Sequence, residues 1–130
     1  MTVQDIYKKS KAWIFEKPSS SIYDDYIVDI INKVLAEIFE ENNMCRMFNN
    51  LPPLTSIPQV STTSDDLDKL GIMLEYQLDV IPKGIDSNFL MDDDLSKMSK
   101  YDVEYNNARV AHQKLISKEK LDAYTTPANV

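Results

Sequence analysis

The sequence predicts an all-α protein: a small bundle of about four helices with a long proline-rich connector and an extended carboxyl-terminal tail. Four segments repeat apolar residues at spacings of three and four, which is the period of an amphipathic helix. No segment shows sustained alternation of apolar and polar residues, so strands should be minor. Because 130 residues is close to a common domain size, we expect one helical domain over residues 1–122 and a tail over residues 123–130.

The composition excludes several classes of protein. A formal net charge of -7 and a pI near 4.6 repel nucleic-acid phosphates and anionic lipids, which argues against groove binding or membrane-surface binding. Cys45 is the single cysteine, so no internal disulfide can form and a reducing compartment is expected. Residues 1–16 carry charges throughout, and no run of about 18 apolar residues follows. We therefore expect neither export nor membrane insertion.

The first helix is predicted near the amino end. Thr2 is placed to cap it, and Asp5 suits the positive end of the helix dipole. The residues that follow helical spacing are Val3, Ile6, Tyr7, Trp13 and Ile14. Pro18 and three serines then interrupt the pattern, which predicts a turn.

The clearest helix signal runs from Tyr23 to Phe39. Ser21 and Asp24 resemble a capping box at its start. Asn42 and Asn43 end the strong periodicity, although Met44, Met47 and Phe48 would fit a frayed last turn. The apolar face is made of Ile27, Ile30, Ile31, Val34, Leu35, Ile38 and Phe39.

Residues 49–65 are predicted to form an extended connector, because Pro52, Pro53 and Pro58 remove backbone donors and fix the chain. A short strand over Ile57–Val60 is the one regular element that the composition allows. Two interpretations stay open for this unusually long loop: contact with a neighbouring molecule, or a cover over the end of the bundle.

The third helix is predicted from the spacing of Leu67, Leu70, Leu74, Leu78, Ile81 and Ile85, with Ser64 or Asp65 as its cap. Pro82 should kink or split this helix near Ile81, because proline lacks a donor and its ring clashes with the carbonyl of Leu78. Gly84 should weaken the second piece by about 1 kcal/mol unless something packs closely against it.

The last helix should start at Asp92–Asp94. Its seam alternates spacings of three and four through Met98, Tyr101, Tyr105, Ala108, His112 and Leu115. Val103 and Val110 lie about 200 degrees from this seam, so we expect them outside the core and available to another chain. The pattern fades after Lys120, and Tyr124–Val130 is expected to be an extended tail.

Little in the chain suggests chemistry, and we expect no catalytic, cofactor-binding or metal site. Gly71 and Gly84 are too far apart for a nucleotide-binding loop, and zinc motifs are missing. Asp92, Asp94 and Ser96 imitate part of a calcium loop that then fails at Lys97 and Val103.

A nucleophile and base made of Cys45 and His112 lacks an orienting partner in the sequence. We therefore expect a packed thiol and a hydrogen-bonded structural histidine. Four aromatic residues with the shape to stack nucleobases are expected to be core residues instead, because arginine and lysine are not interleaved with them: Tyr7, Trp13, Tyr101 and Tyr105.

Four motifs in this order resemble the head-tail connector adaptors of long-tailed bacteriophages. They are Thr2–Tyr7 in the first helix, Ile30–Glu37 in the second, Leu51–Thr55 in the proline-rich loop, and Ile81–Ile85. The resemblance spans Thr2 to about Lys120, and it also implies a tyrosine-containing fourth helix, which Tyr101 and Tyr105 match.

The resemblance implies a non-catalytic virion protein of the neck, assembled in the host cytoplasm. Twelve copies would form a ring beneath the portal protein, extend the DNA channel and give a stopper or tail-completion protein a docking surface. DNA would pass an acidic lumen without sequence-specific binding, since like charges release no counterions. The expected interface residues are Val103, Val110, Tyr124, Thr126, Pro127 and Val130.

A second interpretation is a small acidic regulator, antitoxin-like or a DNA mimic, that acts on a basic partner. Molecular size separates the two: an adaptor forms a ring, whereas a regulator is a monomer or dimer bound to its partner. An enzyme is the third and weakest interpretation.

Overall fold

The computed structural model describes residues 1–14, 21, 23–89 and 95–114, with the backbone alone at 95–98. No strand occurs in these ranges, only an isolated bridge between Thr2 and Asp66. The all-α prediction is therefore confirmed for the described chain. Its five α-helices are α1 (Val3–Trp13), α2 (Ile27–Glu37), α3 (Phe39–Phe48), α4 (Ile81–Phe89) and α5 (Leu95–His112), and a π-helical turn, η1 (Tyr76–Val80), leads into α4.

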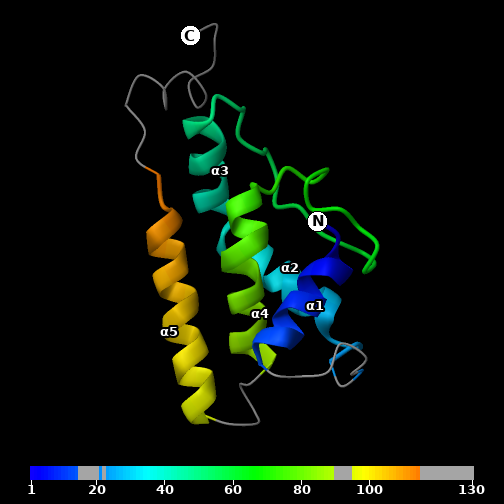
Figure 1. Ribbon diagram of the computed structural model, residues 1–130. Coiled ribbons are helices and arrows are strands. Elements are labelled where there is room, and N and C mark those ends of the chain that lie inside the picture. Colours follow the sequence, from blue (N-terminus) through cyan, green and yellow to red (C-terminus); the bar gives the residue numbers. More distant parts are fainter. Residues whose placement is uncertain (15–20, 22, 90–94, 115–130) are drawn as a thin grey trace, which may run out of the picture.

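Helix α4 is the centre of the bundle. It contacts α1 and α2 on one side and α5 on the other, and Figure 1 shows α4 and α5 side by side, running in opposite directions. The core includes fully buried residues from most of these elements: Val3, Ile6, Ile31, Val34, Leu35, Ile38, Leu67, Tyr76, Val80, Ile81 and Ile85. Burial of this apolar surface is the main driving force for the fold.

The first helix follows its sequence pattern. Thr2 Oγ1 accepts a hydrogen bond from the Asp5 amide at 3.1 Å, and Asp5 Oδ2 accepts one from the Thr2 amide at 3.0 Å. These two bonds form a capping box, which satisfies amides that the helix itself leaves unpaired. The predicted cap and the predicted buried face, including Val3, Ile6 and Tyr7, are both confirmed.

The second helix starts later than its periodicity predicts. Tyr23 lies in a turn, with its ring stacked on Phe89 at a centroid distance of 3.9 Å. Asp24 accepts a hydrogen bond from the Tyr7 hydroxyl at 2.6 Å. The Ser21–Asp24 capping box is therefore wrong: the helix begins at Ile27 without a side-chain cap, because Tyr23 and Asp24 make tertiary contacts instead.

The strong periodicity places the end of that helix at Asn42 and Asn43, whereas helix continues to Phe48, the extension that the apolar residues there allowed. The chain turns at Ile38 and continues as α3 through Asn42 and Asn43 to Phe48. Asn42 is fully buried, and its side-chain amide binds the segment just before the third helix: Nδ2 donates to Gly71 O at 3.1 Å, and Oδ1 accepts from the Met73 amide at 2.9 Å. This asparagine joins two segments rather than ending a helix.

The connector after α3 is irregular, as its prolines predict, and no strand forms over Ile57–Val60. Two asparagines hold its backbone. Asn43 exchanges a pair of hydrogen bonds with Leu54 at 2.8 and 3.1 Å, and Asn32 exchanges a pair with Val60 at 2.8 and 3.0 Å. The connector is therefore fastened to the bundle, as expected for a loop that covers it; contact of this loop with a neighbouring molecule stays a prediction.

The third helix begins at Leu74, not near Leu67. Leu67 is buried within a turn, and Asp65 accepts hydrogen bonds from the Ser61 and Thr62 amides instead of capping a helix. Leu74 and Leu78 are 54% and 40% exposed. Regular helical spacing through Leu67 is thus coincidental, and the predicted apolar face is wrong at these two leucines.

Pro82 marks a change of helix type, as its missing donor predicts. The Ile81 amide donates to Tyr76 O, five residues earlier, which closes the π-helical turn just before the proline. Pro82 has no N–H to donate to the carbonyl four residues earlier, and the wider π-helical turn accommodates this missing hydrogen bond. The interruption near Ile81 is confirmed, although η1 and α4 remain directly joined.

Candidate functional site

Helix α5 is the element on which sequence analysis placed an interaction surface. Tyr101, Tyr105 and Ala108 are buried, as the seam predicts, and the Tyr101 hydroxyl donates to Trp13 O of α1 at 2.9 Å. Met98, Leu115 and the expected start at Asp92–Asp94 lie outside the described side chains. The seam of α5 therefore faces the bundle wherever its side chains are described.

Gly84 explains how α5 approaches α4 closely. A Cβ at this position would lie 2.9 Å from Tyr105 Cε1 and 3.1 Å from Val34 Cγ1. Both distances are shorter than ordinary packing contacts. The tyrosine ring and the valine occupy the space that a side chain would need, which is the close contact anticipated for this glycine.

An arginine fixes the second half of α5 to the junction of α2 and α3. Arg109 Nε donates to Glu41 Oε1 at 3.0 Å, its Nη2 also pairs with Glu41, and Nη2 donates to Glu37 O at 3.2 Å. The side chains are half-buried, and a two-pronged arginine–carboxylate pair is among the stronger polar contacts. The Glu41 hydrogen bond raises the pKa of Arg109, so this cation stays charged.

The carboxyl end of α5 is held by His112. Its Nε2 lies 2.9 Å from Asp79 Oδ2, while Asp79 Oδ1 accepts from Lys83 Nζ at 2.6 Å. Burial alone would raise the pKa of Asp79, but the bonds from Lys83 and His112 outweigh it and hold the pKa below the usual value. The expectation of a hydrogen-bonded histidine is confirmed, with Asp79 as its partner.

The opposite face of α5 points to solvent. Val103 is 57% exposed and Val110 is 66% exposed, so both lie outside the core as predicted. Asn106 and Asn107 between them are exposed as well. The structure thus places two of the six expected interface residues together on one helix face; Tyr124, Thr126, Pro127 and Val130 lie outside the described residues.

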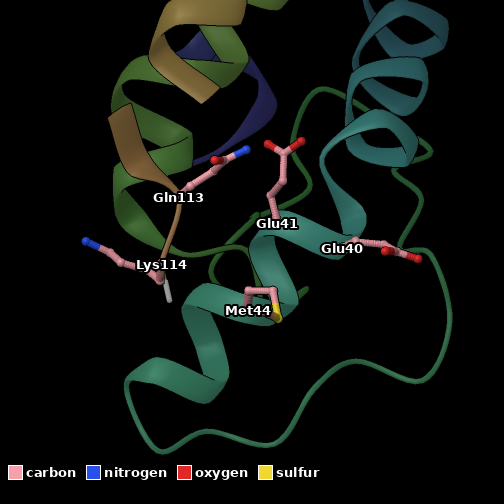
Figure 2. A pocket seen from close by; sticks show the side chains of 5 residues that line it. All are labelled: Glu40, Glu41, Met44, Gln113 and Lys114. Atoms are coloured by element: carbon pink, nitrogen blue, oxygen red, sulfur yellow. The ribbon is translucent and has the colours of Figure 1, made fainter. Parts of the chain in front are cut away.

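An open pocket of about 310 Å³ lies between α3 and the residues that follow α5. Figure 2 shows Gln113 and Lys114 on one side of it and Glu41 and Met44 of α3 on the other, with Glu40 pointing away. Glu41 is already bound by Arg109, and Lys114 Nζ lies 5.5 Å from the centre of the Phe48 ring. Two of the three charged side chains that line this pocket, Glu41 and Lys114, are therefore used in contacts within the chain.

Cys45 and His112 contact different carboxylates. Cys45 is buried, and its Sγ donates to Glu75 Oε1 at 3.0 Å, whereas His112 binds Asp79. Burial, helped by the Glu75 bond, raises the pKa of the Cys45 thiol to about 12. A reactive cysteine needs the opposite shift, toward the thiolate.

Three of the four aromatic residues expected in the core, Tyr7, Tyr101 and Tyr105, are buried. Trp13 is only half-buried, and the ammonium groups of Lys9 and Lys83 lie 5.4 and 5.8 Å from its ring centre. Lys9 stands four residues before Trp13 on α1, so lysine is interleaved with this aromatic residue, contrary to the expectation, whereas Lys83 is brought to the ring by the fold. Such cation–π contacts stabilise exposed rings modestly.

Within the described ranges, no group of three or more His, Cys, Asp or Glu side chains is arranged to hold a metal ion. Among the same residues, no helix has the length and apolar composition needed to cross a membrane.

The sequence pattern did not predict the side-chain contacts that hold the connector and the segment around Gly71 and Met73. Asn32, Asn42 and Asn43 each donate and accept one backbone hydrogen bond, and Arg46 donates to Pro52 O at 2.8 Å and Gly71 O at 3.1 Å. The available signal was an asparagine inside or directly after a strongly periodic helix. Asparagine is a poor helix former, so its presence there favours a tertiary role.

Comparisons of this chain with protein-family models, with curated proteins and with solved structures found no match.

Proposed function

We propose that this chain is a structural protein of the virion, a head-tail connector adaptor whose copies form a ring beneath the portal. In this proposal, twelve copies extend the DNA channel, and the ring offers a surface to a stopper or tail-completion protein. The observation that carries it is the two-sided helix α5, which is bound to the bundle along one face and presents Val103 and Val110 along the other. The family resemblance of the sequence supplies the biological setting.

Contacts along the face of α5 that packs on the bundle hold the helix, and with it the exposed face that carries Val103 and Val110, in a fixed position. Tyr105 packs against Gly84, Arg109 binds Glu41, and His112 binds Asp79. These contacts are spread over about two turns of the helix. A preorganised helix loses little conformational entropy when a partner binds, which favours assembly.

The outer face has the character of an interface. Val103, Asn106, Asn107 and Val110 carry no charge, although charged residues make up 27% of the chain. Depletion of charge is typical of the centre of protein interfaces. One helix face is smaller than the roughly 800 Å² per partner of a stable interface, so the ring also needs other surfaces.

A ring requires that each copy use two different surfaces, because identical patches would close a dimer. Leu74 and Leu78 form a second exposed apolar pair, on the helix that leads into α4. In the proposal, α5 of one copy contacts a different surface of the next copy, and this leucine pair is our candidate. The net charge of -7 suits a lumen past which DNA moves without adhesion.

The test is a pair of matched substitutions on α5. Val103→Asp with Val110→Asp places two charges at the centre of the proposed interface, whereas Val103→Thr with Val110→Thr keeps the side-chain shape. Electron microscopy of the purified chain at high concentration should show rings for the natural sequence and fewer or none for the aspartate variant, with the threonine variant in between. Both variants should keep the helical circular dichroism signal, because these positions are exposed.

Two outcomes would count against the proposal. Rings that form equally well with both aspartates would remove α5 from the interface. A natural chain that stays monomeric or dimeric at every concentration, alone and with portal protein, would remove the ring itself.

A further inference from the structure

Asp86 is a carboxyl group enclosed in the bundle. It lies on α4 with 0% of its surface exposed, and Ser10 Oγ of α1 donates a hydrogen bond to its Oδ1. Its other oxygen, Oδ2, is buried without a hydrogen-bond partner in the described chain. A buried carboxylate oxygen that is left unpaired is costly, whereas a neutral carboxylic acid tolerates the same position much better.

The side chains that the described chain shows acting on Asp86 come from two other helices, α1 and α5. On α1, Ser10 bonds to it, and the neighbouring Lys11 holds its ammonium 4.2 Å from the centre of the Tyr7 ring. On α5, the negative charge of Glu104 repels a negative charge on Asp86. Burial raises the pKa of the Tyr101 hydroxyl, and a charge on Asp86 adds to that rise. The one charge known to act on Asp86 from α5 is therefore repulsive.

Two further contacts close the junction around this carboxyl. Ser87 Oγ of α4 donates to Asp102 Oδ1 of α5 at 3.3 Å, and the Tyr101 hydroxyl of α5 donates to Trp13 O of α1 at 2.9 Å. Helices α1, α4 and α5 are thus joined in pairs by polar bonds near Asp86. A charge that appears at Asp86 must reach water by separating one of these pairs.

We propose that Asp86 is a proton-dependent latch: the junction of α1, α4 and α5 closes around the neutral acid, and α5 loosens when Asp86 ionises. Which of the two neighbouring helices, α1 or α5, moves away follows from the group that each places near Asp86. Ionisation strengthens the bond from the Ser10 hydroxyl, because a charged acceptor binds a donor more tightly. The same charge repels Glu104, so α5 moves and α1 stays.

The direction of the pH dependence follows from the environment of the carboxyl. Burial raises the pKa of Asp86 from 3.8 to about 8; the Ser10 bond acts against this rise and the Glu104 charge adds to it. Because the folded chain holds the proton more tightly than the unfolded chain, the stabilisation is complete below pH 3.8 and disappears as the pH rises through about 8. Between those values, the ratio of folded to unfolded chains falls by up to about tenfold for each pH unit.

The experiment follows the carboxyl directly and the helices separately. The carboxyl carbon of Asp86 in the full chain, observed by NMR between pH 6 and 10, should titrate with a midpoint near pH 8. Amide hydrogen exchange, corrected for its intrinsic pH dependence, should show α5 losing protection in the same range while α1 keeps it. Glu104→Gln should move the midpoint of both signals to lower pH, because one repulsive charge is gone.

Asp86→Asn removes the proton site, and its α5 protection should no longer change over this range. His112→Gln is the matched control, because it removes a different polar contact of α5, the one with Asp79, and this variant should keep the change. The proposal is overturned if Asp86 of the natural chain is already ionised at pH 6. It is also overturned if Asp86→Asn retains the same pH dependence, or if α1 opens before α5.

Discussion

At the scale of single residues, the packing of α4 depends on a missing side chain at one position and on an uncharged side chain at another. Gly84 leaves room for Tyr105 and Val34, and the enclosed position of Asp86 favours its uncharged form. Both residues lie on α4, two positions apart. The middle of α4 is therefore sensitive to small changes in side-chain size and charge.

Gly84→Ala should destabilise the protein although alanine is the better helix former. The propensity gain is about 1 kcal/mol, but the added methyl group would lie 2.9 Å from the Tyr105 ring, and overpacking of this kind costs about 1–3 kcal/mol. We expect a net loss of about 1 kcal/mol in the free energy of unfolding, measured by urea denaturation. A double-mutant cycle with Val34→Ala should show favourable coupling, because one of the two crowded partners is removed; a stabilised Gly84→Ala chain would show that the contact is loose.

At the scale of elements, apolar periodicity predicted helices well where a helix is held mainly by burying one face against the bundle. The buried face of α1 and the seam of α5 follow directly from apolar spacing, and the cap of α1 follows from Thr2. The pattern failed at Tyr23 and at Leu67, where buried side chains lie in turns. Apolar spacing shows that a side chain is buried but cannot distinguish a helix from a packed turn.

Side chains that join segments far apart in the sequence were the other source of error. Asn42 looked like a helix end because asparagine commonly occurs there, but in the fold it binds the backbone at Gly71 and Met73. The π-helical turn before Pro82 likewise depends on a backbone hydrogen bond between residues five positions apart, which the apolar spacing of the sequence does not reveal. For the candidate site, the exposure of Val103 and Val110 was predictable, whereas the Arg109–Glu41 and His112–Asp79 pairs needed the fold.

Asn42→Ala should loosen the segment around Gly71 and Met73 from α3. The change removes two hydrogen bonds and leaves the part-buried Met73 amide without its acceptor. A fully buried group left unsatisfied costs about 1–3 kcal/mol. Because this amide is only part-buried, we expect a loss of about 1 kcal/mol in unfolding free energy and faster hydrogen exchange at Met73. The exposed Asn107→Ala on α5 is the control and should change stability by less than about 0.5 kcal/mol; equal losses in both variants would contradict the proposed fastening.

At the scale of the whole molecule, the described chain is a bundle with an inner helix, α4, and an outer helix, α5 (Figure 1). The connector that follows α3 is fastened by asparagines, so the exposed apolar residues of α5 stand on a well-held surface. Fixed surfaces of this kind suit repeated contacts between copies, and the acidic charge suits a channel for DNA. These properties support the adaptor proposal, which is the central claim.

The most direct test of the adaptor proposal is cryo-electron microscopy of the necks of the virus particles to which the proposal assigns this chain. We predict a ring of this chain directly beneath the portal, with α5 at the contact between neighbouring copies and Val103 and Val110 buried there. Mass spectrometry of the same particles should detect the chain in several copies per particle. Particles with complete necks that lack the chain, or a neck ring in which α5 faces solvent, would contradict the account.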